Sequence, residues 1–241
     1  MILYQLFTNY GQGVSRYGML NVGAFIFALL SALVLHEIAH GLVALWNGDN
    51  TAKVYKRLSL NPARHFDLVG LLLMLLVGFG WAKPVPVNPN NFKNRKVGAI
   101  TVSIAGVTTN LILAFLAALG FQLFSMIEIT SQAMNYFVYF LLMTTRLMMS
   151  LNVSFALFNL LPLYPLDGYR LISCFVSGNK SVMVFLRRYS LYILFGLIAI
   201  DYLFDYMPVL GGFSPLTLYI NGLGGLIQQG FSSFWRLIFN G

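Results

Sequence analysis

The sequence predicts an all-α polytopic membrane protein: a helical bundle of about four to six transmembrane helices, with a re-entrant element and a short extended loop on the cytoplasmic side. Hydrophobic residues make up 58% of the chain and charged residues 9%, and the mean hydropathy is +0.75, which excludes an ordinary soluble domain. Several apolar runs approach the ~20 residues that a spanning helix needs. We expect one membrane-embedded domain over residues 1–241, with a core at about 19–175 and C-terminal helices at about 185–241.

The first predicted span covers about residues 19–47. Residues 1–18 are apolar but short and broken by glycine, which favours an interfacial segment, and no cleaved signal peptide is indicated. The polar stretch 47–67 follows, and it carries four basic residues: Lys53, Lys56, Arg57 and Arg64. Because basic loops stay in the cytoplasm, the first span runs from outside to inside.

Residues 68–82 are apolar but too short to span comfortably, and the next stretch, 83–97, is again basic. A re-entrant element keeps both basic stretches on the cytoplasmic side, and non-helical backbone is tolerated at that depth where protein or water covers it. Within the second stretch, Pro84-Val-Pro-Val-Asn-Pro89 is expected to be extended, because each proline restricts the residue before it. Such an edge can pair with another extended chain.

The later spans alternate in direction. The second, at about 98–124, runs outward and contains Gly106-Val-Thr-Thr-Asn110, whose small and polar residues allow close helix packing. The third, at about 147–166, runs inward, with Arg146 at the outer interface. The basic stretch 173–190 is then cytoplasmic. Beyond it we expect a fourth span at about 190–206 and a possible fifth at 214–239.

A metal-binding pattern, His36-Glu37-Ile-Ala-His40, lies in the second half of the first span. Histidines four residues apart share one face of a helix, so both imidazoles can reach one cation. Zinc accepts neutral imidazole and leaves a position for water, and Glu37 stands where a general base is needed. Ionisable groups inside an apolar span are costly and indicate function.

The third ligand is predicted to be Asp167, which ends the third span at the same membrane face as His36 and His40. Two histidines and one carboxylate form a common catalytic zinc site. The competing interpretation is a carboxylate that only stabilises a Pro-x-Asp-Gly turn. His65 is an alternative third ligand, but its polar loop favours a hydrogen bond that orders the loop.

Four motifs occur in order along the chain: His36-Glu-Ile-Ala-His40, Asn61-Pro-Ala-Arg-His-Phe-Asp67, Gly78-Phe-Gly-Trp-Ala-Lys-Pro-Val-Pro-Val-Asn88 and Asn159-Leu-Leu-Pro-Leu-Tyr-Pro-Leu-Asp-Gly168. Together they resemble the site-2 protease family of intramembrane zinc metalloproteases, in its short prokaryotic branch. The resemblance covers roughly residues 20–175. It departs from the family pattern at Val107 and Tyr169, neither of which is an expected ligand.

The resemblance implies one Zn²⁺ bound by His36, His40 and Asp167, with Glu37 as the catalytic base. Asn152 matches an asparagine that contacts the substrate or stabilises the oxyanion. The expected substrates are transmembrane segments or signal-peptide remnants of membrane proteins. Further candidate substrate contacts are Asn159, Trp81, Pro84, Val85 and Pro86.

Two other functions stay open: a non-catalytic relative that binds membrane segments, and a zinc or proton transporter. The intact Glu37 disfavours the first, and the concentration of polar groups at one depth disfavours the second. The net charge of +8 lies in loops and suits membrane topology, not nucleic acid, and the single Cys174 excludes an internal disulfide. We expect a multi-pass protein of a prokaryotic cell membrane, its active site nearer the cytoplasmic face, with the bilayer, its substrates and a separate regulatory membrane protein as partners.

Overall fold

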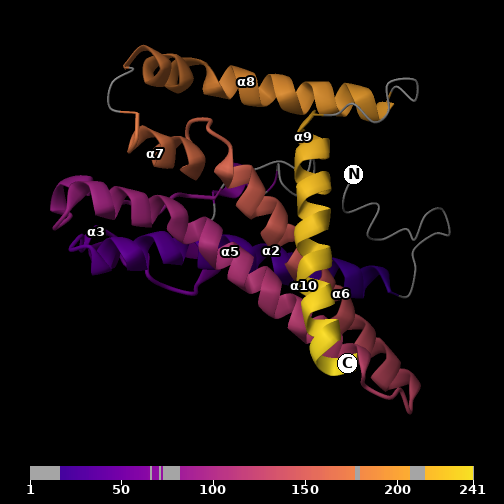
Figure 1. Ribbon diagram of the computed structural model, residues 1–241. Helices are drawn as coiled ribbons and strands as arrows, with labels where there is room; N and C mark the ends of the chain where they lie inside the picture. The colour runs from indigo at the N-terminus through magenta and orange to yellow at the C-terminus, as the bar shows by residue number, and fades with distance from the viewer. Residues whose placement is uncertain are drawn as a thin grey trace.

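The computed structural model describes residues 17–65, 67–70, 72, 82–176, 180–206 and 215–240. Its long elements are all helices (Figure 1), which confirms the predicted all-α class. Most of the predicted interfacial segment 1–18 and of the predicted re-entrant element 68–82 lies outside the described residues, so both stay predictions.

Three long helices form the centre of the molecule: α2 (Gly18–Trp46), α5 (Arg95–Ser125) and α6 (Gln132–Leu160) (Figure 1). The amide group of Asn47, just after α2, donates to Thr101 near the start of α5 at 3.0 Å, so these helices are antiparallel. Tyr139, early in α6, donates to Asn21, early in α2, at 2.7 Å. Helices α2 and α6 are therefore parallel, as the alternation of spans predicts.

Helix α2 buries a stripe of small residues. Ala24, Ala28 and Ala32 are fully buried at intervals of four, and the same series continues through the buried His36 and His40. Small side chains let neighbouring backbones approach closely. The stripe therefore carries both histidines into the contact between α2 and the other central helices.

The ends of the helices follow local sequence signals. Helix α2 ends at Trp46, and Gly48, two residues later, turns the backbone away: its φ of +105° suits glycine, and its N–H donates to the carbonyl of Leu45. Asn94 and Ser131 cap the first turns of α5 and α6 by accepting from Val97 N–H and Met134 N–H. The first and second spans thus match their predicted ranges closely.

The predicted bounds of the third span, 147–166, are wrong. Helix α6 begins at Gln132, passes through Arg146 without interruption and ends at Leu160. Arg146 is exposed on the helix surface, where its long side chain needs no break in the backbone. Pro162 sets the early end, because it disfavours helical backbone at Leu161, whose ψ is 136°.

The predicted start of the fourth span, at about residue 190, is also wrong, because the second half of the basic stretch 173–190 is already helical. After α7 (Asp167–Ser173), helix α8 runs over Lys180–Tyr206 and includes Arg187 and Arg188. Residues 180–190 contain neither proline nor glycine, so nothing interrupts the helix there. Figure 1 shows α8 set apart from the three central helices.

The C-terminal region is helical without a gap through α9 (Pro215–Thr217), a π-helical turn η3 (Leu218–Leu223) and α10 (Gly224–Asn240). Helix α10 crosses α5 and α6 (Figure 1), and Trp235 donates to the carbonyl of Phe115 at 3.0 Å. Within the described residues, four helices are long and apolar enough to cross a membrane: α2, α5, α6 and Ser181–Asp201 of α8. Three short elements lie in the connections: α3 (Thr51–Val54), η1 (Pro62–Arg64) and η2 (Pro89–Asn91).

Candidate metal centre and active site

His36, His40 and Asp167 converge at one point although Asp167 is far from the histidines in sequence. The two Nε2 atoms lie 3.1 Å apart. Asp167 Oδ2 lies 3.3 Å from Nε2 of His36 and 3.1 Å from Nε2 of His40. All three side chains are buried, and they are the metal-binding cluster found among the described residues.

A close turn after α6 brings Asp167 back to this point. Gly168 packs directly against the backbone of Leu160, so that a Cβ at position 168 would overlap the Leu160 carbonyl. Only glycine fits such an approach. Because α6 is parallel to α2, its end lies at the depth of the histidines, and Asp167 starts α7 there.

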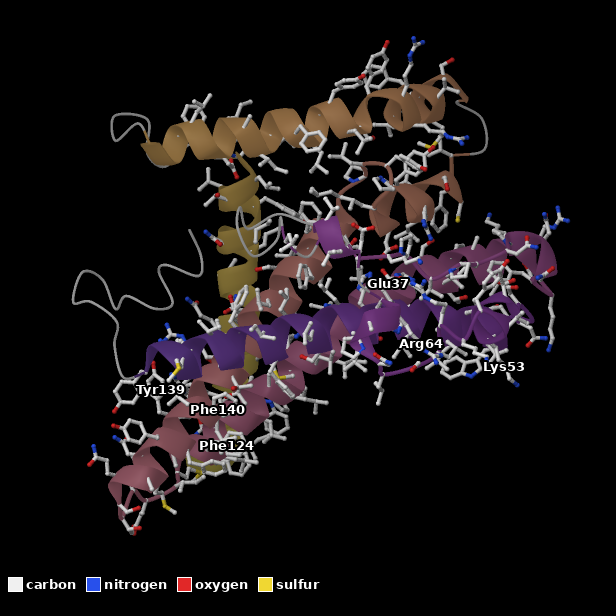
Figure 2. All side chains as sticks on the ribbon, turned by 180° about the vertical axis from the view of Figure 1, so that it is seen from behind. Glu37, Lys53, Arg64, Phe124, Tyr139 and Phe140 are labelled. Carbon is white, nitrogen blue, oxygen red and sulfur yellow. The ribbon has the colours of Figure 1, made fainter. Side chains whose placement is uncertain are left out.

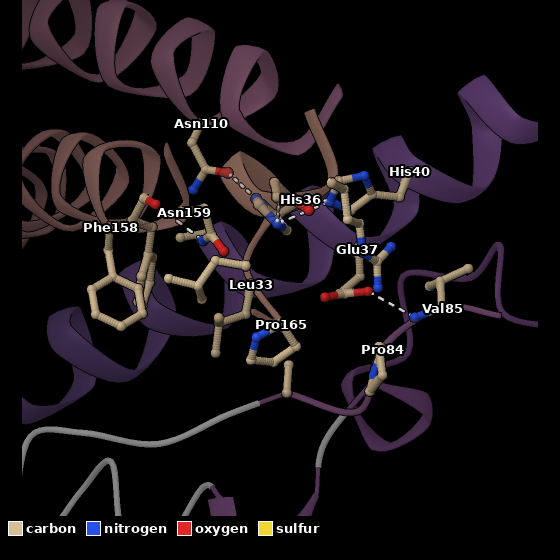
Figure 3. A pocket seen from close by; sticks show the side chains of 16 residues that line it. Leu33, His36, Glu37, His40, Pro84, Val85, Asn110, Phe158, Asn159 and Pro165 are labelled. Carbon is tan, nitrogen blue, oxygen red and sulfur yellow. Dashed lines mark hydrogen bonds and ion pairs between the residues drawn. The ribbon is translucent and has the colours of Figure 1, made fainter. Parts of the chain in front are cut away.

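Helix α5 fixes the tautomer of both imidazole rings through contacts with their Nδ1 atoms, on the side away from Asp167. Nδ1 of His40 lies 2.7 Å from the carbonyl oxygen of Val102, which can only accept, so this nitrogen carries the proton. Nδ1 of His36 lies 2.8 Å from Oδ1 of Asn110 (Figure 3). Both Nε2 atoms therefore turn lone pairs toward Asp167, an arrangement that ligating histidines share.

Gly106 lies between these two anchor points on α5, four residues from each. An added Cβ would sit 2.6 Å from both ring nitrogens of His36. Any side chain at this position would displace the ring. Residues 102, 106 and 110 thus form one helix face whose spacing of four matches that of the two histidines.

The geometry suits a tetrahedral cation. Ligands about 2.0–2.1 Å from zinc stand about 3.3 Å from one another at tetrahedral angles, and the separations observed between the three ligand atoms are 3.1–3.3 Å. Asp167 Oδ2 is buried with no hydrogen-bond partner, and a buried polar atom without a partner requires an explanation. Two lone pairs and a carboxylate oxygen at these distances repel one another unless a cation lies between them.

Glu37 follows His36 but points into a cavity of about 310 Å³ beside the three ligands. It is half-buried, and its Oε2 accepts a hydrogen bond of 2.8 Å from the backbone N–H of Val85 (Figure 3). The cavity is lined by Ala32, Leu33, His36, Glu37, His40, Ala82, Pro84, Val85, Asn110, Phe155, Phe158, Asn159, Pro165, Leu166, Asp167 and Arg170.

The loop wall of this cavity, residues 82–88, is not helical, in agreement with the predicted extended loop. Arg57 donates to the carbonyls of Lys83 and Pro84 at 2.6 and 3.3 Å. Asp49 accepts from Asn88 N–H at 2.7 Å and from the Asn91 amide group at 2.7 Å. These two charged residues hold the loop wall at both ends.

The hydrogen bonds to Asp49 also affect its ionisation. Burial opposes the charged form, but donors from Thr51, Asn88 and Asn91 outweigh burial, and the pKa of Asp49 lies below its ordinary value. Sequence reasoning missed this carboxylate, and it treated Arg57 only as a charge that sets topology. Neither residue type nor spacing signals a loop anchor of this kind.

The remaining predicted site residues fall into three groups. Asn159, Pro84 and Val85 line the cavity, whereas Asn152 and Pro86 are not among its lining residues. Trp81 lies outside the described residues. His65 is buried away from the three ligands, with Nε2 2.7 Å from the carbonyl of Ser59, so it makes the loop hydrogen bond expected of it.

Sequence reasoning also missed Gly106 and Asn110 as parts of the site. It interpreted their motif only as a packing surface. The interval of four between them, equal to that between His36 and His40, was the available signal.

Comparison with known proteins gives a consistent result. The family model described as "Peptidase family M50" matches residues 24–200. A Bacillus subtilis (strain 168) protein named "Putative zinc metalloprotease YwhC" is 40% identical over 174 residues, covering 68% of this chain and 75% of that protein. A Synechocystis protein named "Putative zinc metalloprotease sll0528" is 26% identical over 251 residues, covering 99% of this chain and 51% of that protein. No solved structure matches the chain.

Proposed function

This chain belongs to peptidase family M50, the site-2 protease family, and from that membership we propose that it is a zinc-dependent intramembrane endopeptidase. Its substrates would be transmembrane segments or signal-peptide remnants of membrane proteins. One observation carries the proposal: a two-histidine, one-carboxylate cluster and a glutamate share one cavity inside a bundle of apolar helices.

His36, His40 and Asp167 would hold one Zn²⁺ per chain. When bound there, zinc would acidify a water molecule and polarise the carbonyl group of the peptide bond. The chain supplies the rest of the chemistry. Its α5 face keeps both Nε2 atoms unprotonated, and the burial of the three ligand side chains limits the access of bulk water.

Glu37 is the proposed general base. Its Oε2 is fixed by the N–H of Val85, while its carboxylate faces the cavity beside the ligands. The carboxylate takes the proton from the attacking water and passes it to the amide nitrogen as the C–N bond breaks. The products are a carboxylic acid, which takes the OH of the water, and an amine, which takes its remaining hydrogen.

Asn159 is better placed than Asn152 to contact the oxyanion. The amide nitrogen of Asn159 donates one hydrogen to the carbonyl of Phe155 at 3.0 Å, which leaves a second hydrogen in a residue that lines the cavity. Asn152 is fully buried and does not line it. We therefore give Asn159 the oxyanion contact that the family resemblance suggested for Asn152.

The substrate must lose its helical structure locally, because the carbonyls of a helix are hydrogen-bonded and shielded. The apolar side chains of Leu33, Phe155 and Phe158 offer a surface for the side chains of an unwound segment. The loop wall, with Pro84, Val85 and Pro86, offers an extended backbone alongside it.

The distribution of charge supports a cytoplasmic location for the site. Figure 2 shows Lys53 and Arg64 at one end of the central helices, Tyr139 toward the other, and Glu37 nearer the basic end. Basic residues flanking spans stay in the cytoplasm. We therefore propose that the site faces the cytoplasmic half of a prokaryotic cell membrane, where a separate regulatory membrane protein could meet it.

Cleavage of single-span substrates in proteoliposomes tests the proposal, with zinc counted in each preparation. Glu37→Gln keeps the shape of the side chain but removes the base, so it should bind one zinc and lose cleavage by at least about 100-fold. Glu128→Gln, at an exposed glutamate between α5 and α6, is the matched control and should keep both zinc and activity.

Three other outcomes would each contradict a different part of the proposal. A Glu37→Gln protein that cleaves normally would overturn the role of Glu37. Zinc in the wild type without cleavage of any single-span substrate would favour a non-catalytic binding relative. Zinc flux into sealed vesicles without cleavage would favour a transporter.

A further inference from the structure

We infer that Asn110 and Asn152 form a hydrogen-bond chain that fixes the tautomer and the orientation of His36. Both asparagines are then positioning residues of the metal centre, and neither needs to touch the substrate. The inference rests on the proposed function, since it concerns the proposed zinc ligands.

The carbonyl group of Met148, at the end of the series farthest from His36, sets the direction of every hydrogen bond in the series. The carbonyl oxygen of Met148 can only accept, so the amide nitrogen of Asn152 faces it, at 2.7 Å. Oδ1 of Asn152 is thereby turned toward α5, where it accepts from the amide nitrogen of Asn110 at 3.1 Å. Oδ1 of Asn110 must then face His36.

The same direction continues into the imidazole ring. Because Asn110 presents an oxygen to Nδ1 of His36 at 2.8 Å, that nitrogen must carry the proton. Nε2 is then unprotonated, and it is the atom beside Asp167. Three bonds thus connect a backbone carbonyl of α6, through α5, to one ligand atom on α2.

Burial makes this direction hard to reverse. Asn110 and Asn152 are both fully buried, so no solvent can satisfy a rotated amide group. If the Asn110 amide rotated, its nitrogen would face Nδ1 of His36 and the proton would move to Nε2. A protonated Nε2 cannot bind a metal, so reversal of the amide removes one ligand.

The two histidines differ in what holds them. Nδ1 of His40 is held by the backbone carbonyl of Val102, which no side-chain substitution can rotate. His36 depends on two side-chain amides in series. Substitutions of Asn110 or Asn152 should therefore act on the metal centre through His36 and leave His40 in place.

The test is zinc affinity in detergent, measured by competition with a chelator, together with the visible absorption spectrum of the Co²⁺-loaded protein. Asn110→Leu removes the acceptor and should weaken zinc binding about 10–100-fold, the usual effect of losing the hydrogen-bond partner of a ligating histidine. Asn152→Leu leaves the Asn110 amide without its anchor and should weaken binding about tenfold. Both should change the Co²⁺ spectrum.

Two further variants separate positioning from general packing. Asn110→Asp keeps an acceptor that faces Nδ1 of His36 but loses the donor to Oδ1 of Asn152, so its zinc affinity should lie between those of the wild type and Asn110→Leu. Thr145→Val is the matched control on α6. Thr145 is buried seven residues before Asn152, its hydroxyl bonds only to carbonyls of its own helix, and its loss should leave zinc affinity unchanged.

Wild-type zinc affinity and spectrum in folded Asn110→Leu and Asn152→Leu proteins would overturn the inference. So would an Asn110→Asp protein as weak as Asn110→Leu. If Asn110→Leu fails to fold, the comparison of Asn152→Leu with Thr145→Val decides. A wild-type protein that binds no zinc would overturn the proposed function itself. The zinc count of the wild type therefore distinguishes this outcome from a failure of the present inference.

Discussion

The metal centre and its cavity are held from two sides by elements that are built on different principles. The helix wall is the face of α5 that carries Val102, Gly106 and Asn110, of which only Asn110 lines the cavity, and it meets the histidines within the buried bundle. The loop wall, residues 82–88, meets Glu37 through one backbone N–H and is itself held by Arg57 and Asp49.

The difference separates two tasks. Contacts of the helix wall are fixed by a rigid helix whose residues are buried, so its geometry has little freedom. The loop wall is partly exposed and depends on hydrogen bonds from two charged side chains, and such segments open at lower free energy than buried helices. A rigid wall suits metal binding, and an adjustable wall suits the admission of an unwound substrate.

The largest effect is expected from Gly106→Ala, in the helix wall. The new Cβ would lie 2.6 Å from the ring nitrogens of His36 and displace the ring, so zinc affinity should fall by at least about 100-fold. Gly23→Ala in α2 is the control, because its Cβ would meet only Phe140, at an ordinary 3.6 Å. Chelator competition measures both, and unchanged zinc affinity in Gly106→Ala would show that the helix wall is not rigid.

An intermediate effect is expected from Arg57→Met, in the loop wall. Losing the charge-assisted hydrogen bonds to two carbonyls should lower the free energy of opening the loop wall by about 1.5–3 kcal/mol. Amide hydrogen exchange at residues 83–85 should accelerate and cleavage should fall, while zinc affinity stays unchanged. Lys53→Met removes an exposed cation of α3 and serves as control. A loss of zinc in Arg57→Met would mean that the two walls are not separable.

The smallest effect is expected from the ionisation of Asp49. Its pKa is lowered in the folded protein, so its contribution to stability is fully present above the ordinary value of 3.8 and is lost as the pH falls through the lowered pKa of the folded protein. The far end of the loop wall should therefore loosen only in strong acid.

A dye on Asn90→Cys, in a Cys174→Ala background, would report that loosening by fluorescence anisotropy. Asp49→Asn should show the loosened state already at neutral pH, because it cannot accept on both sides. Identical anisotropy in the two proteins at pH 7 would exclude Asp49 as an anchor.

Much of the fold could be predicted from the sequence, because lipid imposes simple rules on length and charge. The ranges of α2 and α5 and the parallel course of α2 and α6 followed from apolar runs and basic loops. The end of α6 did not, since Pro162 lies within a run that is apolar on both sides. The start of α8 did not either, because a basic stretch can be helical as well as a loop.

The sequence by itself determined the chemistry at the centre: a histidine pair with one glutamate, spaced for one helix face, and an aspartate just beyond the inner end of a span of the same direction. Only the tertiary structure decided what surrounds that centre. The partners of His36, His40 and Glu37 come from 74, 62 and 48 residues away in the chain. Local periodicity can place a side chain on a face, but contacts over such separations depend on how whole helices and loops pack together.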